Sequence, residues 1–188
     1  LAEVFQRHQA PIVVFAEAVE LARIKEAQSD PAIAGVEEQL RLLRAAGHEI
    51  ALHLHPQWSR AQFRNGFWEL DYSEYNLCVL HVDRIARIVD DAIGYLCEAL
   101  GEARFSPLSF RAGNWLFQPT QHAAAVLASR GLKVDSSVFK GGLQRRHRLD
   151  YRRALTNGWA WRFANDVNVP DARGPLLELP IYTQMVPF

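Results

Sequence analysis

The fold is decided by residues 47–58, GHEIALHLHPQW, where an apolar strand pattern ends in two histidines. Side chains alternate along a strand, so the aliphatic residues point to one face while His53 and His55 point to the other. Residues two apart on a strand lie about 6.6 Å from each other, which brings both imidazoles within reach of one Zn²⁺. Pro56 ends the strand, because proline has no N–H for the ladder. The pattern favours metal binding or catalysis over a surface strand with incidental histidines.

Strand and helix patterns alternate along the rest of the chain. The expected helices cover residues 1–8, 36–43, 82–100 and 119–130, and strands are expected at 12–15, at the histidine pair, at 108–111, at 132–136 and twice within 159–182. Three segments are predicted to be connections: a polar stretch around Asp30-Pro31, a long aromatic loop over 59–75 and an irregular segment over 139–158. Alternation without repeats or a linker indicates βαβ units, a mostly parallel sheet and one α/β domain over residues 1–188.

The charge balance excludes some classes of partner. The chain of 188 residues carries 21 Lys and Arg against 21 Asp and Glu. A nucleic-acid binder or a protein of anionic membranes normally has a basic excess, so neither is expected. The one basic cluster covers 145–148 with Arg152-Arg153, and a solvated loop is favoured there over an anion site, although it could touch phosphate on an activated sugar. No apolar run approaches the length of a membrane span.

The two cysteines, Cys78 and Cys97, have neither metal-ligand spacing nor a CxxC pattern. They indicate reduced, buried thiols rather than a disulfide framework, and a cytoplasmic location is therefore favoured. The chain starts with Leu1 and its only methionine is Met185, so we expect the native N-terminus to lie outside it. The lack of a signal peptide then says little about the compartment.

Four segments together resemble the NodB-homology polysaccharide deacetylases, carbohydrate esterase family four. Residues 47–53, GHEIALH, resemble the second motif of the family, and 109–115, SFRAGNW, resemble its arginine-containing third motif. Residues 134–137, VDSS, resemble the fourth, and 176–180, LLELP, fall where the fifth is expected. The resemblance covers nearly the whole chain. It is strongest to a divergent branch from surface-polysaccharide gene clusters, in which HLHP-type and FRAGxW-type motifs occur together.

The resemblance implies a distorted (β/α) barrel, with its first strand before Leu1 and further elements after Phe188. It also implies a hydrolase that uses a divalent metal, with zinc as the expected ion, to remove N-acetyl groups from an amino sugar of a surface polysaccharide or its precursor. In this family the metal is held by one aspartate and two histidines, and the base is a neighbouring aspartate on the same first strand. Asp90-Asp91 does not replace that pair, because it falls inside a predicted helix.

His53 matches the first metal histidine of the family. The second lies four residues later in the family, where this chain has Gln57, whose amide oxygen is a poor zinc ligand. His55 is therefore the second expected ligand, by its place on the same strand face. Glu49 shares that face but lies about 13 Å from His53 along the strand, which excludes it from the metal.

Three charged residues and two tryptophans complete the candidate site. Arg111 matches the arginine that orients the catalytic aspartate in the family, while an ion pair with Asp135 is an equally weighted alternative. Asp135 resembles the aspartate of the fourth motif, which supports the acid or the arginine. Glu178 could replace the missing histidine of the fifth motif as the acid, with a pKa raised by burial, unless it pairs with a loop arginine. Trp58 and Trp115 follow the motifs and suit sugar rings, with core packing as the alternative.

Two other functions stay open on this evidence. A relative that binds glycan without hydrolysing it would explain Gln57 and the absence of any histidine after His147. A hydrolase of a small amide on the same fold is the other alternative, and the aromatic segment over 59–75 weakly favours a sugar over such a substrate.

Overall fold

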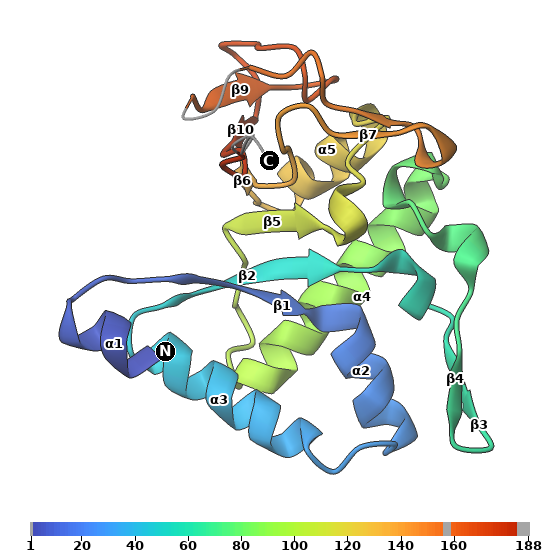
Figure 1. Ribbon diagram of the computed structural model, residues 1–188. Coiled ribbons are helices and arrows are strands. Elements are labelled where there is room, and N and C mark those ends of the chain that lie inside the picture. Colours follow the sequence, from blue (N-terminus) through green and yellow to red (C-terminus); the bar gives the residue numbers. More distant parts are fainter. Residues whose placement is uncertain (1, 156–158, 184–188) are drawn as a thin grey trace, which may run out of the picture.

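The structure is a computed structural model that describes residues 2–155 and 159–183, and a six-stranded sheet organises it (Figure 1). The order of the strands is β1-β2-β5-β6-β10-β9. All neighbouring strands are parallel except β10 and β9, which are antiparallel. Their bounds are Val13–Glu17 for β1, Glu49–Leu54 for β2, Ser109–Ala112 for β5, Val134–Asp135 for β6, Leu176–Glu178 for β10 and Trp161–Phe163 for β9. The predicted α/β class with a mostly parallel sheet is confirmed.

Helices cover one face of this sheet. They are α2 (Ala18–Ala27), α3 (Ile33–Ala45), α4 (Val82–Leu100) and α5 (Gln121–Ser129), and a short α1 (Ala2–Arg7) precedes β1 (Figure 1). The longest, α4, buries apolar residues at a helical spacing and ends at Gly101, whose φ of 69° gives the left-handed C-cap. No helix in the described part of the chain is long and apolar enough to cross a bilayer.

The two faces of the sheet have different environments. On β2, the side chains of Ile50, Leu52 and Leu54 are buried in the core that the helices cover. Residues opposite each other on parallel strands share a face, so the register places Phe110 and Asp135 on this covered face as well.

The other face carries the strand ends that concern function. The register pairs Glu17 with His53 and His53 with Arg111, so these three side chains form one row across β1, β2 and β5. Helices α2, α3 and α4 pack against β2, whose residues Ile50, Leu52 and Leu54 point into the core on the opposite side from this row. The fold therefore presents a carboxylate, an imidazole and a guanidinium on one side of the sheet.

Two predictions about connections were wrong. The polar stretch before Asp30-Pro31 contains the helix α2, which the carboxylate of Glu17 caps by accepting from the N–H of Glu20. The segment 59–75 is not a plain loop, because β3 (Gln62–Arg64) and β4 (Phe67–Glu69) form an antiparallel hairpin in it. Asn65 and Gly66 turn that hairpin with φ of 52° and 81°, the positive values that Asn-Gly supplies in a two-residue turn.

The remaining connections contain short 3₁₀ turns and one small hairpin. The 3₁₀ turns are η1 (Pro56–Trp58), η2 (Tyr72–Glu74), η3 (Leu77–Val79), η4 (Gly113–Trp115) and η5 (Arg145–His147). The segment 139–158 was expected to be irregular, but in it β7 (Leu143–Gln144) pairs with β8 (Leu149–Asp150). Buried Glu74 anchors the hairpin segment. It accepts hydrogen bonds from Arg84 at 2.9 and 2.7 Å and from the hydroxyl of Ser59 at 2.6 Å.

Candidate metal centre

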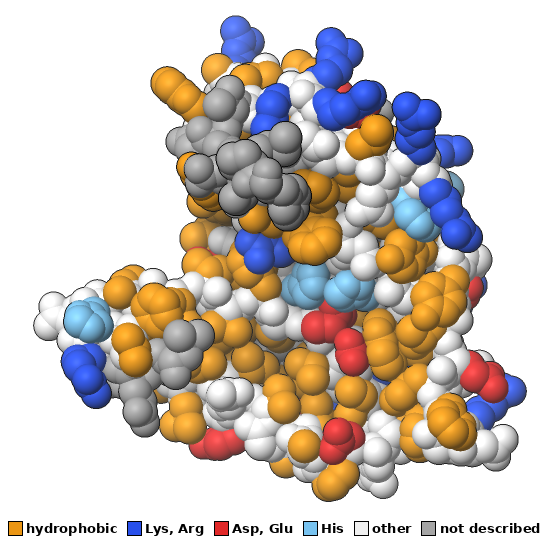
Figure 2. Space-filling model, in the orientation of Figure 1, with side chains coloured by type: hydrophobic (Ala, Val, Ile, Leu, Met, Phe, Trp, Pro, Cys, Tyr) orange, Lys and Arg blue, Asp and Glu red, His pale blue; other side chains and the backbone are white. Residues whose placement is uncertain are grey.

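Three potential metal ligands meet on the face of the sheet opposite the helices, at the carboxyl ends of β1 and β2. They are Glu17, His53 and His55, and their ligand atoms all lie within 4.8 Å of one another. Figure 2 shows histidines next to acidic side chains near the centre of this face. Carboxyl ends of parallel strands come together at one edge of a sheet, which is where α/β proteins place their ligands. The two histidines that the sequence predicted as a pair are brought together.

Glu17 is the ligand that the sequence reasoning missed. The first strand was expected to stop at Phe15, but β1 continues to Glu17, so its last residue is a carboxylate beside His53. Glu17 Oε1 accepts from the backbone N–H groups of His55 at 3.1 Å and of Glu20 at 3.3 Å. Its other oxygen, Oε2, lies 2.7 Å from His55 Nδ1 and 3.8 Å from His53 Nε2. Two backbone donors thus hold one oxygen and aim the other at the imidazoles.

His53 is held in the form that a metal ligand needs. Its Nδ1 lies 2.7 Å from the carbonyl oxygen of Arg111, and since a carbonyl only accepts, Nδ1 carries the proton. The lone pair is then on Nε2, the nitrogen that faces Glu17. Burial lowers the pKa of His53, which favours the neutral imidazole. A backbone carbonyl that fixes the tautomer in this way is the usual outer partner of a metal-binding histidine.

The donor set fits a divalent metal. Two imidazole nitrogens and one carboxylate oxygen are the ligands of many catalytic zinc sites, in which the fourth position stays open. The cluster of Glu17, His53 and His55 could therefore hold such an ion. The 2.7 Å contact between Glu17 and His55 is a hydrogen bond, so Glu17 can either bind the ion or orient His55 from behind. Gln57 is buried in η1, and among the described residues its Oε1 has no hydrogen-bond partner.

Arg111 lies beside His53, at the end of β5. Its Nε donates to the carbonyl of Ser136 at 2.8 Å and its Nη2 donates to the hydroxyl of Ser136 at 2.9 Å. The guanidinium lies 4.0 Å from the centre of the Phe15 ring, and burial lowers its pKa. Within the described part of the chain, Arg111 makes no direct ion pair with Asp135, the alternative that the sequence left open. Its fixed charge is at the rim of the candidate metal centre.

Asp135 and Glu178 lie together on the covered face, away from the histidines. They are opposite each other on β6 and β10, and both are buried. Asp135 accepts from the hydroxyl of Ser137 at 2.7 Å, and Glu178 Oε1 accepts from the N–H of Val138 at 3.1 Å. Burial raises the pKa of both carboxyls, and that of Glu178 lies well above its usual range. Burial beside Asp135 therefore favours the protonated form of Glu178. Its catalytic role stays a prediction.

Replacing Glu178 by Gln should flatten the dependence of stability on pH. The pKa of Glu178 is raised above its unfolded value of about 4.3. Its contribution is therefore fully present below about pH 4.3 and is lost as pH rises through the folded value. Gln keeps a hydrogen-bond donor and has no proton to lose. Thermal melts from acidic to alkaline pH should show a smaller loss of Tm for Glu178→Gln than for wild type, with Glu69→Gln in the exposed hairpin as control. Parallel profiles for all three proteins would refute the raised pKa of Glu178.

The two tryptophans differ in exposure. Trp58 is half-buried against the core, and its ring packs edge-on against Trp68 at a centroid distance of 5.1 Å. Trp115 is 44% exposed and its ring packs against Phe139 at 5.6 Å. Trp58 therefore packs in part against the core, whereas Trp115 keeps a surface that a ligand can contact. A role in substrate binding stays a prediction for both.

Gly113 allows the FRAGNW segment to approach the histidines closely. A Cβ at this position would lie 2.6 Å from the carbonyl oxygen of Leu54 and 2.7 Å from Cδ2 of His55. Gly113→Ala should therefore displace the His55 ring, lower the free energy of unfolding by about 1–3 kcal/mol and weaken metal binding. Chemical denaturation and metal titration measure the two effects. Gly94→Ala is the matched control, because a Cβ there meets nothing within 4 Å. Unchanged metal affinity in Gly113→Ala would show that the His55 position does not matter.

No protein-family model and no curated protein matches this chain.

Proposed function

We propose that this protein is a metal-dependent hydrolase that removes N-acetyl groups from an amino sugar of a surface polysaccharide or its precursor. The proposal depends above all on the cluster of Glu17, His53 and His55 at the ends of parallel strands. It is supported by the resemblance of four motifs to NodB-homology polysaccharide deacetylases. The proposal includes a distorted (β/α) barrel, to which strands of the six-stranded sheet would contribute.

Each residue of the site has its own role in the proposed reaction. Glu17, His53 and His55 would hold a divalent ion such as zinc, which when bound polarises an acetamide carbonyl or a water molecule. Arg111 supplies a fixed positive charge beside His53, where negative charge develops on the amide oxygen. Its hydrogen bonds to Ser136 and its contact with Phe15 hold that charge in place. Trp115 offers an exposed ring for the carbohydrate substrate.

Asp135 is a positioning residue in this proposal. Its carboxylate accepts from the hydroxyl of Ser137, whose oxygen in turn accepts from the N–H of Ala112 at 2.9 Å, at the end of β5. This chain of bonds ties β6 to the strand that carries Arg111. Glu178 is the candidate acid on sequence grounds, and full acetate release by Glu178→Gln would remove it from the mechanism without affecting the metal centre.

Acetate release tests the proposal. The protein would be treated with a chelator, dialysed, and assayed on N-acetylated chitooligosaccharides with and without Zn²⁺, Co²⁺ or Mn²⁺. We expect release to stop after chelation and to return with one of the metals. Saccharide binding without release under every metal would favour the non-hydrolytic glycan binder, and hydrolysis confined to small amides would favour the amidohydrolase.

A further inference from the structure

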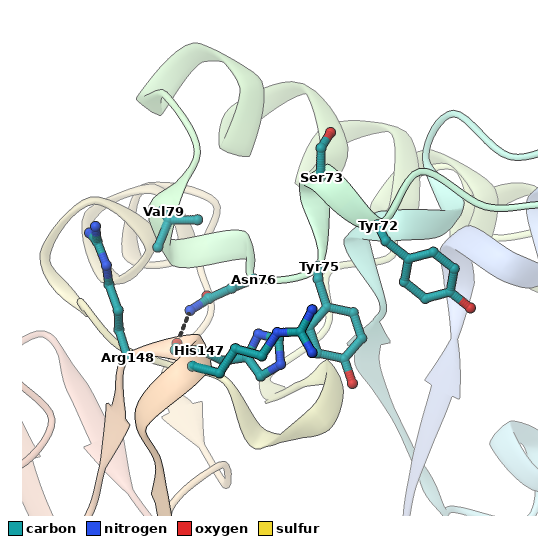
Figure 3. A pocket seen from close by; sticks show the side chains of 8 residues that line it. Tyr72, Ser73, Tyr75, Asn76, Val79, His147 and Arg148 are labelled. Atoms are coloured by element: carbon teal, nitrogen blue, oxygen red, sulfur yellow. Dashed lines mark hydrogen bonds between the residues drawn. The ribbon is translucent and has the colours of Figure 1, made fainter.

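A hollow apart from the candidate metal centre combines aromatic rings with arginines. It has a volume of about 400 Å³ and lies between the η2–η3 segment and η5. Figure 3 shows the rings of Tyr75 and His147 lying together, with Tyr72 to one side and Arg148 to the other. The residues that line it are Tyr72, Ser73, Tyr75, Asn76, Val79, Arg146, His147 and Arg148. None of them belongs to the candidate metal centre.

Buried Asn76 holds the two walls of this hollow together. Its Nδ2 donates to the carbonyl oxygens of His147 and Gln118, both at 2.9 Å. The rings of Tyr75 and His147 pack at a centroid distance of 4.6 Å, and Tyr72 lies 6.2 Å from Tyr75. A polar side chain that is buried and satisfied in this way fixes its neighbours. The hollow is therefore a built feature of the fold, in which Tyr72 is 66% exposed.

Positive charge is concentrated beside these rings. Residues 145–153 contain five arginines and one aspartate, a balance of 5 − 1 = +4 in a chain whose net charge is zero. The aspartate, Asp150, is engaged by Arg152 at 2.6 Å. Arg146 and Arg148 are exposed, and within the described residues neither forms an ion pair. Arginine pairs well with carboxylate and phosphate, and its charge here is open to a ligand.

The hollow is within reach of the candidate metal centre. The N–H of Asp71 donates to the carbonyl of Gln57 at 3.2 Å, and Gln57 follows His55 by two residues. The path from His55 through this bond to Tyr72 is therefore shorter than about 20 Å, a distance that an oligosaccharide of a few rings spans. Figure 2 shows the histidines and a group of Lys and Arg side chains on the same face of the molecule.

We infer that this hollow binds an anionic saccharide, through its phosphoryl or carboxylate group at Arg146 and Arg148 and its ring faces at Tyr72 and Tyr75. The inference rests on the proposed function for its link to the metal centre, since it makes the substrate an acidic glycan or an activated sugar. Aromatic faces accept the C–H surface of a sugar, while guanidinium groups select for negative charge. A neutral glycan would use the rings and leave the arginines without a partner.

Direct binding tests this inference. Metal is first removed by dialysis against 1,10-phenanthroline, so that acetyl groups stay in place, and calorimetry measures Kd for three probes. They are hexameric oligogalacturonate, UDP-N-acetylglucosamine and neutral chitohexaose. The variant is Arg146→Ala/Arg148→Ala, and the matched control is Arg7→Ala/Arg104→Ala, which removes two exposed arginines in α1 and after α4.

We expect one of the two anionic probes to bind wild type more tightly than chitohexaose, and added salt to weaken it. The Arg146→Ala/Arg148→Ala variant should raise the Kd of that probe by about tenfold or more, with chitohexaose little changed. The probe that responds tells a carboxylate from a pyrophosphate ligand. Equal Kd values in wild type and the variant, an equal loss in the Arg7/Arg104 control, or no preference for either anionic probe would overturn the inference. Binding of an anionic probe, together with no acetate release from N-acetylated chitooligosaccharides by the metal-reloaded protein, would refute the proposed function and leave this binding site standing.

Discussion

Metal binding should be lost when His53 is replaced by Ala. His53 presents Nε2 towards Glu17 because its other nitrogen is bound to the carbonyl of Arg111. Its loss leaves the cluster with one imidazole and one carboxylate. Loss of an outer partner of a metal ligand alone costs about 10–100-fold in affinity, and loss of the ligand should cost more than about 100-fold. Elemental analysis after equilibrium dialysis against Zn²⁺ measures the effect, and acetate release should fall with it.

Controls separate the ligands from their neighbours. His122→Ala removes an exposed histidine on α5 and should leave the metal content unchanged. Glu17→Ala and His55→Ala should both reduce it. If Gln57 completes the site in place of His55, then His55→Ala retains the metal and Gln57→Ala loses it. Equal metal content in wild type and His53→Ala would refute the candidate centre.

Replacing Arg111 by Lys should lower kcat by about 100-fold while KM and metal content change little. Lysine keeps the charge but cannot donate from two fixed nitrogens to the backbone and hydroxyl of Ser136, and it does not stack on Phe15 as a planar guanidinium does. The charge would then be misplaced in the transition state, where orientation matters most.

A purely structural role for Arg111 predicts a different result. In that case Arg111→Lys would lower Tm and spare the turnover of the protein that stays folded. Ser136→Ala is the informative companion variant, because it removes the hydroxyl partner of Nη2 and keeps both the guanidinium and the backbone acceptor of Nε. Steady-state kinetics together with thermal melts decide between the two roles.

Much of the fold could be predicted from the sequence because its helices and strands have local residue patterns. The alternation over β2 and the apolar stripe of α4 each repeat over several residues, which makes the element and its buried face recognisable. The hairpin in 59–75 was missed although Asn65-Gly66 is the usual signal of a two-residue turn. Helix α2 was missed because its sequence is only weakly amphipathic and lies between charged residues.

The candidate site could be predicted only in part, because the positions of some of its residues depend on which strands lie next to each other. His53 and His55 are neighbours in sequence, so alternation alone brought them together. Glu17 joins them through the parallel pairing of β1 with β2, which no local pattern reveals. Strands as short as β6 and β10 give no readable alternation, so the sequence could not tell that Asp135 and Glu178 face the covered side.

X-ray absorption spectroscopy of the zinc-loaded protein tests the central claim most directly. If Glu17, His53 and His55 bind one ion, the wild-type spectrum should show two imidazole ligands with nitrogen and oxygen at about 2.0–2.1 Å. His55→Ala should then show one imidazole. Two imidazoles in both proteins, or a shell of oxygen ligands only, would contradict the metal centre on which the proposed function depends.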